Sequence, residues 1–237
     1  MQNNVPITQN TIKRLLKDIK DIKNNSLETN GIYYKHSDDD ILKGYALIIG
    51  QKNTPYEHGF YFFDIKYPCN YPHSPPTFKY CTNDGFTRFN PNLYIDGKVC
   101  LSILNTWSGE QWSACQTIST ILLTICTILN DKPLLNEPGI SETHRDFNNY
   151  NKIITYKNFD TAICNYFETI NFNNKYSFFH SIIKNYFMEN YNNIIENIKN
   201  NTIDKTRINL SIYNMSTFIN YQNLLQRLET IYFSLKN

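Results

Sequence analysis

The chain has 237 residues, of which 41% are hydrophobic and 15% aromatic. That is enough apolar material for one buried domain of about 150 residues with a shorter extension, and it excludes a disordered chain. The net charge of +2 is too small for the broad positive surface of a nucleic-acid-binding domain, so we expect no nucleic acid partner.

The first residues, MQNNVPITQN, contain no hydrophobic targeting segment. No run approaches the roughly 20 apolar residues that span a bilayer, so we expect no membrane association. The six cysteines form no CxxC pair, which is typical of reduced thiols in an intracellular protein. We expect a cytoplasmic or nuclear protein. The heavy use of Asn, Ile, Lys and Tyr indicates an AT-rich genome, and a viral source would place the protein in the host cytoplasm.

Residues 10–23 have the periodicity of an amphipathic helix. Its apolar stripe comprises Ile12, Leu15, Leu16, Ile19 and Ile22. Lys13, Arg14, Lys17 and Lys20 lie mostly off that stripe. This basic face is either a solvated surface or a docking surface.

Residues 31–80 contain four apolar segments separated by Gly, Pro and charged residues. This pattern predicts an antiparallel meander of about four strands. Between the third and fourth segments, the stretch YPCNYPHSPPTF is rich in proline, which removes backbone donors and fixes φ. We therefore expect a stiff surface loop there.

Four further helices are predicted from periodicity, over residues 113–129, 142–169 with an interruption near Lys157, 176–199 and 215–235. Ser113 and Gln116 have the spacing of a capping box at the start of the first of these. Cys115 and Cys126 are expected on or near its inner side. The stripe of the last helix would include Phe218 and Tyr221. An Asn-rich joint at 171–174 divides the chain into a core domain, residues 1–170, and a helical extension, residues 171–237.

The stretch from Arg88 to Ser113, RFNPNLYIDGKVCLSILNTWSGEQWS, carries the chemistry. It resembles the active-site segment of ubiquitin-conjugating enzymes, in which a His-Pro-Asn tripeptide precedes the catalytic Cys at a fixed distance. Here Asn90-Pro91-Asn92 takes the place of the tripeptide and Cys100 follows eight residues after Asn92. The resemblance covers roughly residues 8–165 and includes the proline-rich loop. An ordered set of motifs of this length is much more specific than one short pattern.

Two further patterns narrow the resemblance. The extra residues Asn-Thr-Trp-Ser-Gly at 105–109 and Asn-Glu-Pro-Gly at 136–139 are similar to those of the larger conjugating enzymes, including the giant inhibitor-of-apoptosis-type enzyme. The resemblance implies an α+β fold in which a four-stranded antiparallel meander is flanked by helices, with an α-helical C-terminal extension. It also implies a carrier that receives ubiquitin or a ubiquitin-like protein from an activating enzyme.

The implied reaction needs a thiol, because a thioester is stable enough to diffuse and reactive enough to acylate an amine. Cys100 is the predicted thioester site. Asn92 either stabilises the oxyanion or holds the active-site loop in shape. Many family members place an Asp directly before the Pro at 133 to orient the incoming lysine, but Lys132 stands there. Asp131 is the candidate substitute, its alternative being a plain loop carboxylate.

The resemblance also implies partner surfaces. Lys13, Arg14 and Lys17 correspond to the face that meets the activating enzyme. His73 stands where family members often place a Phe for ligase contact, and Ser113-Ala114 replaces the common Ser-Pro. Because both changes lose apolar or rigid contact area, we expect weak binding of the usual ligases. The expected partners are thus ubiquitin or a ubiquitin-like protein, an activating enzyme, protein substrates and, in some reactions, a ligase.

Three alternatives remain open. The first is a non-catalytic ubiquitin-binding module of the same fold, although such variants lack the Cys. The second is a Cys-His hydrolase, but no histidine lies in a protease signature. The third is a zinc site, which the Cys and His spacings do not fit. We expect no metal and no organic cofactor, since ATP is used by the activating enzyme.

Overall fold

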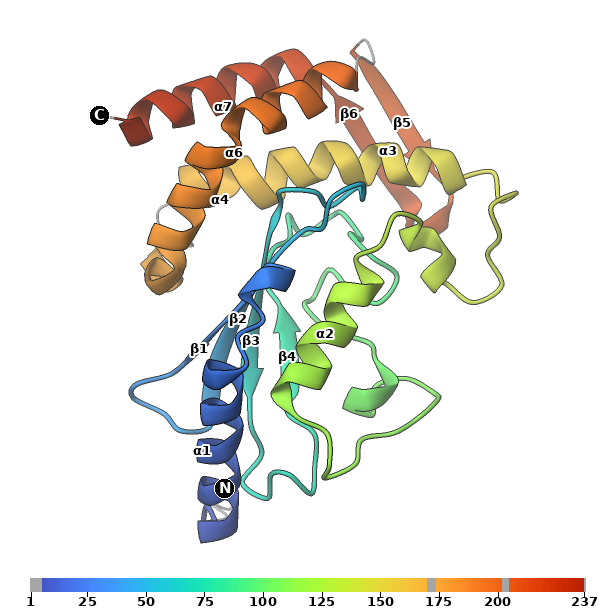
Figure 1. Cartoon of the computed structure of the whole chain (residues 1–237). Helices are drawn as coiled ribbons and strands as arrows, with labels where there is room; N and C mark the ends of the chain where they lie inside the picture. The colour runs from blue at the N-terminus through green and yellow to red at the C-terminus, as the bar shows by residue number, and fades with distance from the viewer. Residues whose placement is uncertain (1–5, 170–173, 202–204, 237) are drawn as a thin grey trace.

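The four-stranded meander is present as predicted. The computed structural model describes residues 6–169, 174–201 and 205–236. Strands β1 (Ile32–His36), β2 (Lys43–Ile49), β3 (Phe60–Lys66) and β4 (Thr77–Tyr80) pair antiparallel in chain order. The sheet lies at the centre of the molecule with helices around it (Figure 1). The α+β fold class is therefore confirmed.

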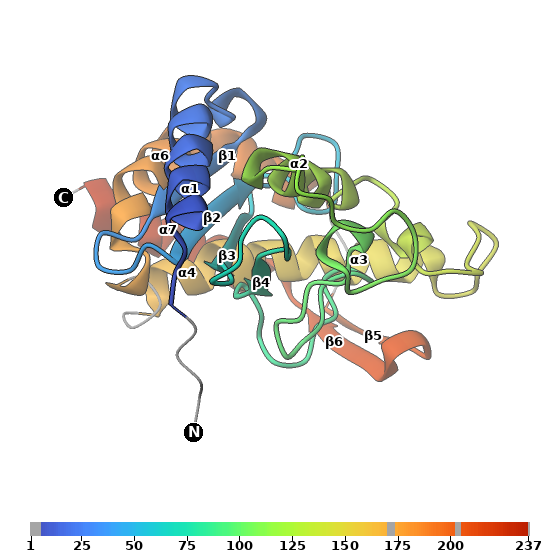
Figure 2. The same cartoon turned by 90° about the horizontal axis from the view of Figure 1, so that it is seen from below.

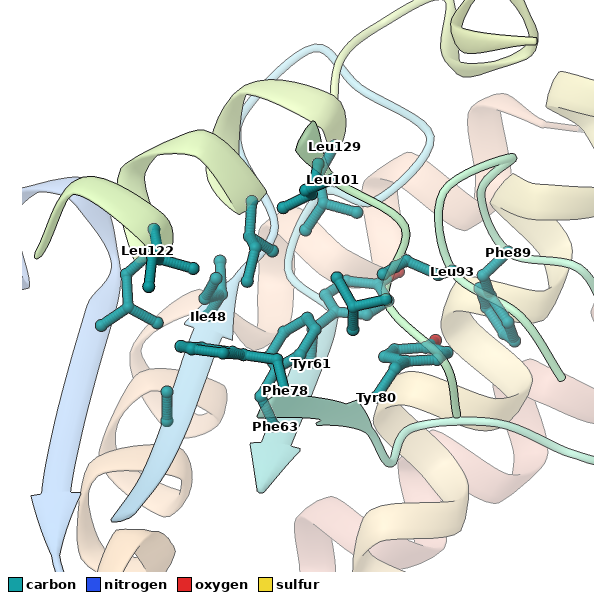
Figure 3. Packing of buried hydrophobic residues seen from close by; sticks show 14 of the residues in the cluster. Ile48, Tyr61, Phe63, Phe78, Tyr80, Phe89, Leu93, Leu101, Leu122 and Leu129 are labelled. Carbon is teal, nitrogen blue, oxygen red and sulfur yellow. The ribbon is translucent and has the colours of Figure 1, made fainter. Parts of the chain in front are cut away.

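Helices α1 (Gln9–Asn24) and α2 (Ile118–Ile128) cover one face of this sheet, as the view from below makes clear (Figure 2). Between them lies the main core. Figure 3 shows Leu122 and Leu129 at the α2 side facing Ile48, Phe63 and Phe78 of the strands. This packing arises because alternate residues of β2 and β3 point to opposite faces of the sheet.

The predicted first helix is confirmed within one residue at each end, and the Thr8 hydroxyl accepts a hydrogen bond from the Thr11 N–H at 3.1 Å to cap it. One member of its predicted stripe is wrong, because Leu16 is 55% exposed. The remaining members of that stripe are buried or partly buried: Ile12, Leu15, Ile19 and Ile22.

The predicted start of the second helix at Ser113 is wrong. The helix begins at Ile118, where the Thr117 hydroxyl accepts from the Thr120 N–H at 3.3 Å. The Ser113 N–H does donate to the Gln116 side chain at 3.3 Å, but it closes a turn before the helix. Cys115 is therefore exposed, against the prediction, whereas Cys126 packs against the core as expected.

The predicted helix over 142–169 begins five residues later than expected, as α3 (Phe147–Lys157). The expected interruption near Lys157 is a π-helical segment, Asn158–Cys164, which runs into α4 (Asn165–Glu168). Asn158 anchors this segment. Its buried side chain accepts from the Tyr61 hydroxyl at 2.6 Å and donates to the Glu57 carbonyl at 2.7 Å.

The extension contains more than helices. Helix α6 (His180–Asn200) confirms the prediction over 176–199, after a short 3-10 turn. The predicted helix over 215–235 is wrong in its first part. Strand β6 (Met215–Ile219) pairs with β5 (Thr206–Leu210) in a hairpin, and only then does α7 (Tyr221–Lys236) begin. Phe218 is accordingly 47% exposed on a strand.

The extension packs on the core domain through a second apolar cluster. Leu47, Ile49, Phe60 and Phe62 point away from α2, toward the segment 159–166 and the first turns of α6. Helix α7 packs against α6 and the π-helical segment, and α3 crosses one end of the sheet (Figure 1). The joint at 171–174 lies almost wholly outside the described residues, so the predicted boundary at 170/171 stays a prediction.

Within the described ranges, no helix has the length and apolar character needed to cross a bilayer. In the same ranges, no three His, Cys, Asp or Glu side chains are grouped in a way that could hold a metal ion.

Candidate functional site

Cys100 lies at the end of a loop that is closed on itself. The Cys100 N–H donates to the Asn92 carbonyl at 2.8 Å, and the Asn92 side-chain amide donates to the Cys100 carbonyl at 2.7 Å. The flanking residues Leu93, Val99 and Leu101 are buried in the main core, and Figure 3 shows Leu93 and Leu101 pointing into it. The eight-residue spacing therefore places Asn92 and Cys100 side by side.

Of the two predicted roles for Asn92, the loop-holding one is visible here, since its amide donor is occupied by the Cys100 carbonyl. Its Oδ1 atom is buried without a hydrogen-bond partner. The oxyanion role stays a prediction.

Asn90, which stands where the family usually has His, is fully buried with both ends of its amide bonded. Its Nδ2 donates to the Tyr56 hydroxyl at 2.9 Å and to the Ile128 carbonyl at 2.7 Å. Its Oδ1 accepts from the Asn92 N–H at 3.0 Å and, at 3.4 Å, from the Asn136 side chain. The residue thus joins the Cys100 loop to the end of α2 and to the segment 136–139.

Thr106, from the extra loop at 105–109, covers the thiol. The Cys100 side chain is 3% exposed and its Sγ–H donates to the Thr106 carbonyl at 3.0 Å. The Thr106 hydroxyl accepts from the Leu101 N–H at 2.9 Å and donates to the Val99 carbonyl at 2.8 Å. The hydrolase alternative gains no support, because the thiol donates to a carbonyl and not to a histidine.

Burial raises the pKa of the Cys100 thiol above its ordinary value. The positive charges of Lys98 and Arg88 act in the opposite direction, and the negative charge of Glu137 adds to the rise. The thiol is therefore protonated at neutral pH.

This raised pKa predicts how alkylation of Cys100 depends on pH. Only the thiolate attacks iodoacetamide, so the rate should keep rising above about pH 8.5, where an ordinary thiol is half ionised. Lys98→Glu should move the profile to still higher pH, because it replaces a charge that lowers the pKa with one that raises it. Mass spectrometry of Cys100 peptides measures the rates, with Lys20→Glu on α1 as the control. Superimposed profiles for Lys98→Glu and the unmodified chain would contradict this assignment.

Asp131 is exposed, and its backbone carbonyl accepts from the Asn151 side chain at 2.8 Å. The neighbouring Lys132 pairs with Glu142 at 2.5 Å, and this hydrogen bond raises the pKa of Lys132. The cation that stands in place of the usual Asp is thus turned toward another carboxylate. A catalytic role for Asp131 stays a prediction.

The predicted basic docking face divides into two kinds of residue. Lys13 and Lys17 are exposed, but Arg14 is engaged within the molecule. Its guanidinium pairs with the buried Asp18 at 2.9 Å and donates to the carbonyls of Ala114 and Gln116 at 2.5 and 2.6 Å. Arg14 therefore ties α1 to the segment that precedes α2. The role of all three residues in binding an activating enzyme stays a prediction.

The two loops predicted to meet a ligase are brought together. Trp112 donates its indole N–H to the Pro72 carbonyl at 2.7 Å, and its ring lies 6.0 Å from that of Tyr71. His73 and Ser113-Ala114 are all exposed on either side of this contact. The contact between Trp112 and Pro72 thus joins the two loops that carry these exposed residues.

The comparisons with known proteins agree with this geometry. The family model for ubiquitin-conjugating enzymes matches residues 14–158, well over half of the chain. The chain belongs to the ubiquitin-conjugating enzyme family. The family match includes the closed loop, Cys100 and Asn92, and it ends at Asn158, where the π-helical segment begins.

Among the relatives, ubiquitin-conjugating enzyme E2 Z of Danio rerio is 39% identical over 169 residues, which are 70% of this chain and 51% of that protein. The protein of the same name from Xenopus tropicalis is 36% identical over 215 residues, 85% of this chain and 65% of the relative. The Homo sapiens protein is 44% identical over 132 residues, 54% and 37% respectively. The chain thus spans between about a third and two thirds of the length of these relatives.

Four residues around the Cys100 loop were not among the sequence predictions: Arg88, Thr106, Glu137 and Tyr213. Thr106 and Glu137 lie in the two patterns that set the larger conjugating enzymes apart, so those patterns contained a usable signal. Tyr213 belongs to the extension, and the three-dimensional fold brings it against Glu137 and Arg88.

Proposed function

We propose that this chain accepts ubiquitin or a ubiquitin-like protein as a thioester on Cys100 and transfers it to a substrate lysine or to a ligase. The observation that carries this proposal is the closed loop in which Asn92 and Cys100 bond to each other. This loop holds the Cys100 thiol at a fixed place, and a thiol is the group that carries an acyl chain as a thioester.

The partners follow from the same reaction. An activating enzyme uses ATP to prepare the modifier, so the chain itself needs no cofactor. Exposed Lys13 and Lys17 form the surface proposed for that enzyme, and the joined loops around Trp112 form the one proposed for a ligase. The acceptors are lysines of protein substrates in the cytoplasm or nucleus. The non-catalytic module is the second candidate, but a retained thiol in an intact loop favours the carrier.

A loading assay tests the proposal. The full chain is incubated with an activating enzyme, ATP and ubiquitin, then run on gels with and without reducing agent. We expect an adduct that disappears on reduction. A panel of ubiquitin-like proteins with their activating enzymes is tested in parallel. If none of them loads, the chain is better described as a binding module.

A further inference from the structure

The turn of the β5–β6 hairpin is fastened to the start of α3. Asp146, at the start of α3, accepts three hydrogen bonds with one oxygen: from the Ser211 N–H at 3.0 Å, the Ser211 hydroxyl at 2.6 Å and the Ile212 N–H at 2.9 Å. Arg145 also donates to the Ser211 hydroxyl, at 3.0 Å. The hairpin turn, in the middle of the extension, is therefore held at a defined place on the core domain.

This anchoring places Tyr213 between two charged residues. Its hydroxyl donates to Glu137 Oε2, and its ring lies 5.0 Å from the guanidinium of Arg88. The ring also meets Tyr150 edge-on at 6.2 Å. Tyr213 has a φ of 57°, a region that bulky residues occupy only where the surroundings fix them, often at functional sites.

Both charged residues are joined to the Cys100 loop. Arg88 donates to the carbonyls of Asn90 and Pro91 at 3.2 and 2.6 Å, and its guanidinium lies 3.3 Å from the centre of the Tyr94 ring. Glu137 follows Asn136, whose side chain donates to Asn90 Oδ1 at 3.4 Å and to the Ile128 carbonyl at 3.0 Å. Burial is the main cause that raises the pKa of the Cys100 thiol, and the negative charge of Glu137 adds to that rise.

We propose that Glu137 is the carboxylate that draws the incoming lysine to the Cys100 thioester, and that Tyr213 of the extension is the positioning residue that holds this carboxylate. This inference rests on the proposed function. The extension then contributes a residue to the active site. The role of the Asp that many family members have at the position of Lys132 passes to a Glu of the Asn-Glu-Pro-Gly segment.

In the proposed step, the lysine nitrogen forms the new C–N bond and the C–S bond breaks, with its electron pair staying on sulfur. The incoming ammonium gives up two protons. One reaches solvent through the Glu137 carboxylate, and the other ends on the Cys100 sulfur. Glu137 is an acceptor of suitable chemistry because it carries a negative charge, which attracts the ammonium and then removes its proton.

Tyr213 suits the positioning role because it donates without cancelling that charge. Burial, followed by the bond to Glu137, raises the pKa of the Tyr213 hydroxyl far above neutral, so it remains a neutral donor. A lysine or arginine at this place would neutralise the carboxylate and compete with the substrate amine.

The test separates loading from discharge. The full chain and its variants are loaded with ubiquitin, the activating enzyme is stopped, and discharge to free lysine is followed in single turnover. Glu137→Gln should load normally but discharge about 100-fold more slowly, the scale of one proton acceptor. Tyr213→Phe should discharge roughly 3- to 10-fold more slowly, the scale of one lost hydrogen bond. Glu189→Gln and Tyr232→Phe, on α6 and α7, are the matched controls.

Two readouts distinguish these roles from a structural one. The defect of Glu137→Gln should shrink as the pH approaches about 10.4, where free lysine loses its proton unaided. Tyr213→Phe should add nothing in the Glu137→Gln background, since the residue acts through that carboxylate. Glu137→Gln should also lower the pH at which Cys100 is alkylated.

The outcomes separate the two proposals. A loaded Glu137→Gln chain that discharges at the unmodified rate overturns the role of Glu137, while the proposed function stands. A Tyr213→Phe defect that persists in the Glu137→Gln background overturns the positioning role. If the unmodified chain loads no modifier, the proposed function fails and the catalytic assignment falls with it.

Discussion

Cys100→Ser should form an adduct that survives reducing agent, and Cys100→Ala should form none. A hydroxyl in place of the thiol can hold the modifier as an oxygen ester, which thiols exchange far more slowly than a thioester. The serine variant should load slowly, because a hydroxyl is a weak nucleophile at neutral pH. The loss in the alanine variant should be complete.

The exposed Cys115 provides the control for this experiment. Among the cysteines that the structure describes, Cys115 alone is exposed, so any non-specific acylation should occur there first. Cys115→Ala should load as well as the unmodified chain. Intact-mass measurement gives the number of modifiers per chain, and peptide mapping gives the site. The assignment of Cys100 would be wrong if Cys100→Ala still formed a reducible adduct, or if Cys115→Ala formed none.

The meander and the Cys100 loop could be predicted because local sequence determines them. Strands β2 and β3 are dense in apolar and aromatic residues and are bounded by turn signals, and their register places Leu47 opposite Phe62 and Ile48 opposite Tyr61. The spacing of Asn92 and Cys100 is likewise local, because the loop closes on itself through hydrogen bonds between those two residues.

The start of α2 could not be read in the same way, because tertiary contacts decide it. Ser113 and Gln116 have capping-box spacing, yet the segment between them is held out of the helix. Arg14 on α1 donates hydrogen bonds to the carbonyls of Ala114 and Gln116, which a helix starting at Ser113 would need as acceptors for its own backbone N–H groups. Thr117 then caps the helix instead.

The β5–β6 hairpin was missed because the residues of β6 were included in the helix predicted over 215–235. In Met215–Ile219 the residues alternate between buried and exposed, with Thr217 buried and Phe218 exposed. That order reverses the usual preference of the two residue types, so composition favoured the wrong period. The hairpin turn is held by Asp146, which no local pattern could reveal, and the place of Tyr213 beside Glu137 was therefore equally hidden.

The second prediction with a large effect concerns the extension. A chain that ends at Thr169 should not remain folded and soluble, although it contains the whole segment matched by the family model. Phe62 stacks on Tyr176 at 4.4 Å and also contacts Phe179, and both partners are lost. Fully burying a side chain of this size is worth about 1.5–3 kcal/mol. The retained segment 159–166 would still cover part of Leu47, Ile49, Phe60 and Phe62. Partial exposure of these four side chains would cost less than the roughly 6–12 kcal/mol of full exposure, which is still a large share of the stability of a domain.

Point variants on α6 test the same contact in the intact chain. Phe187 is fully buried in the cluster that joins the extension to the sheet, so Phe187→Ala should lower the free energy of unfolding by about 3–5 kcal/mol. Asn185, exposed on the same helix, should change it by less than about 0.5 kcal/mol when replaced by Ala. Denaturant unfolding followed by circular dichroism measures both. Two results together would mean that the extension does not stabilise the sheet. The first is a truncated chain that unfolds cooperatively at the same denaturant midpoint as the full chain, and the second is a Phe187→Ala variant whose free energy of unfolding is unchanged. The expected losses of stability would instead show that the extension is part of the fold. The contact of Tyr213 with Glu137 requires this, because Tyr213 belongs to the extension.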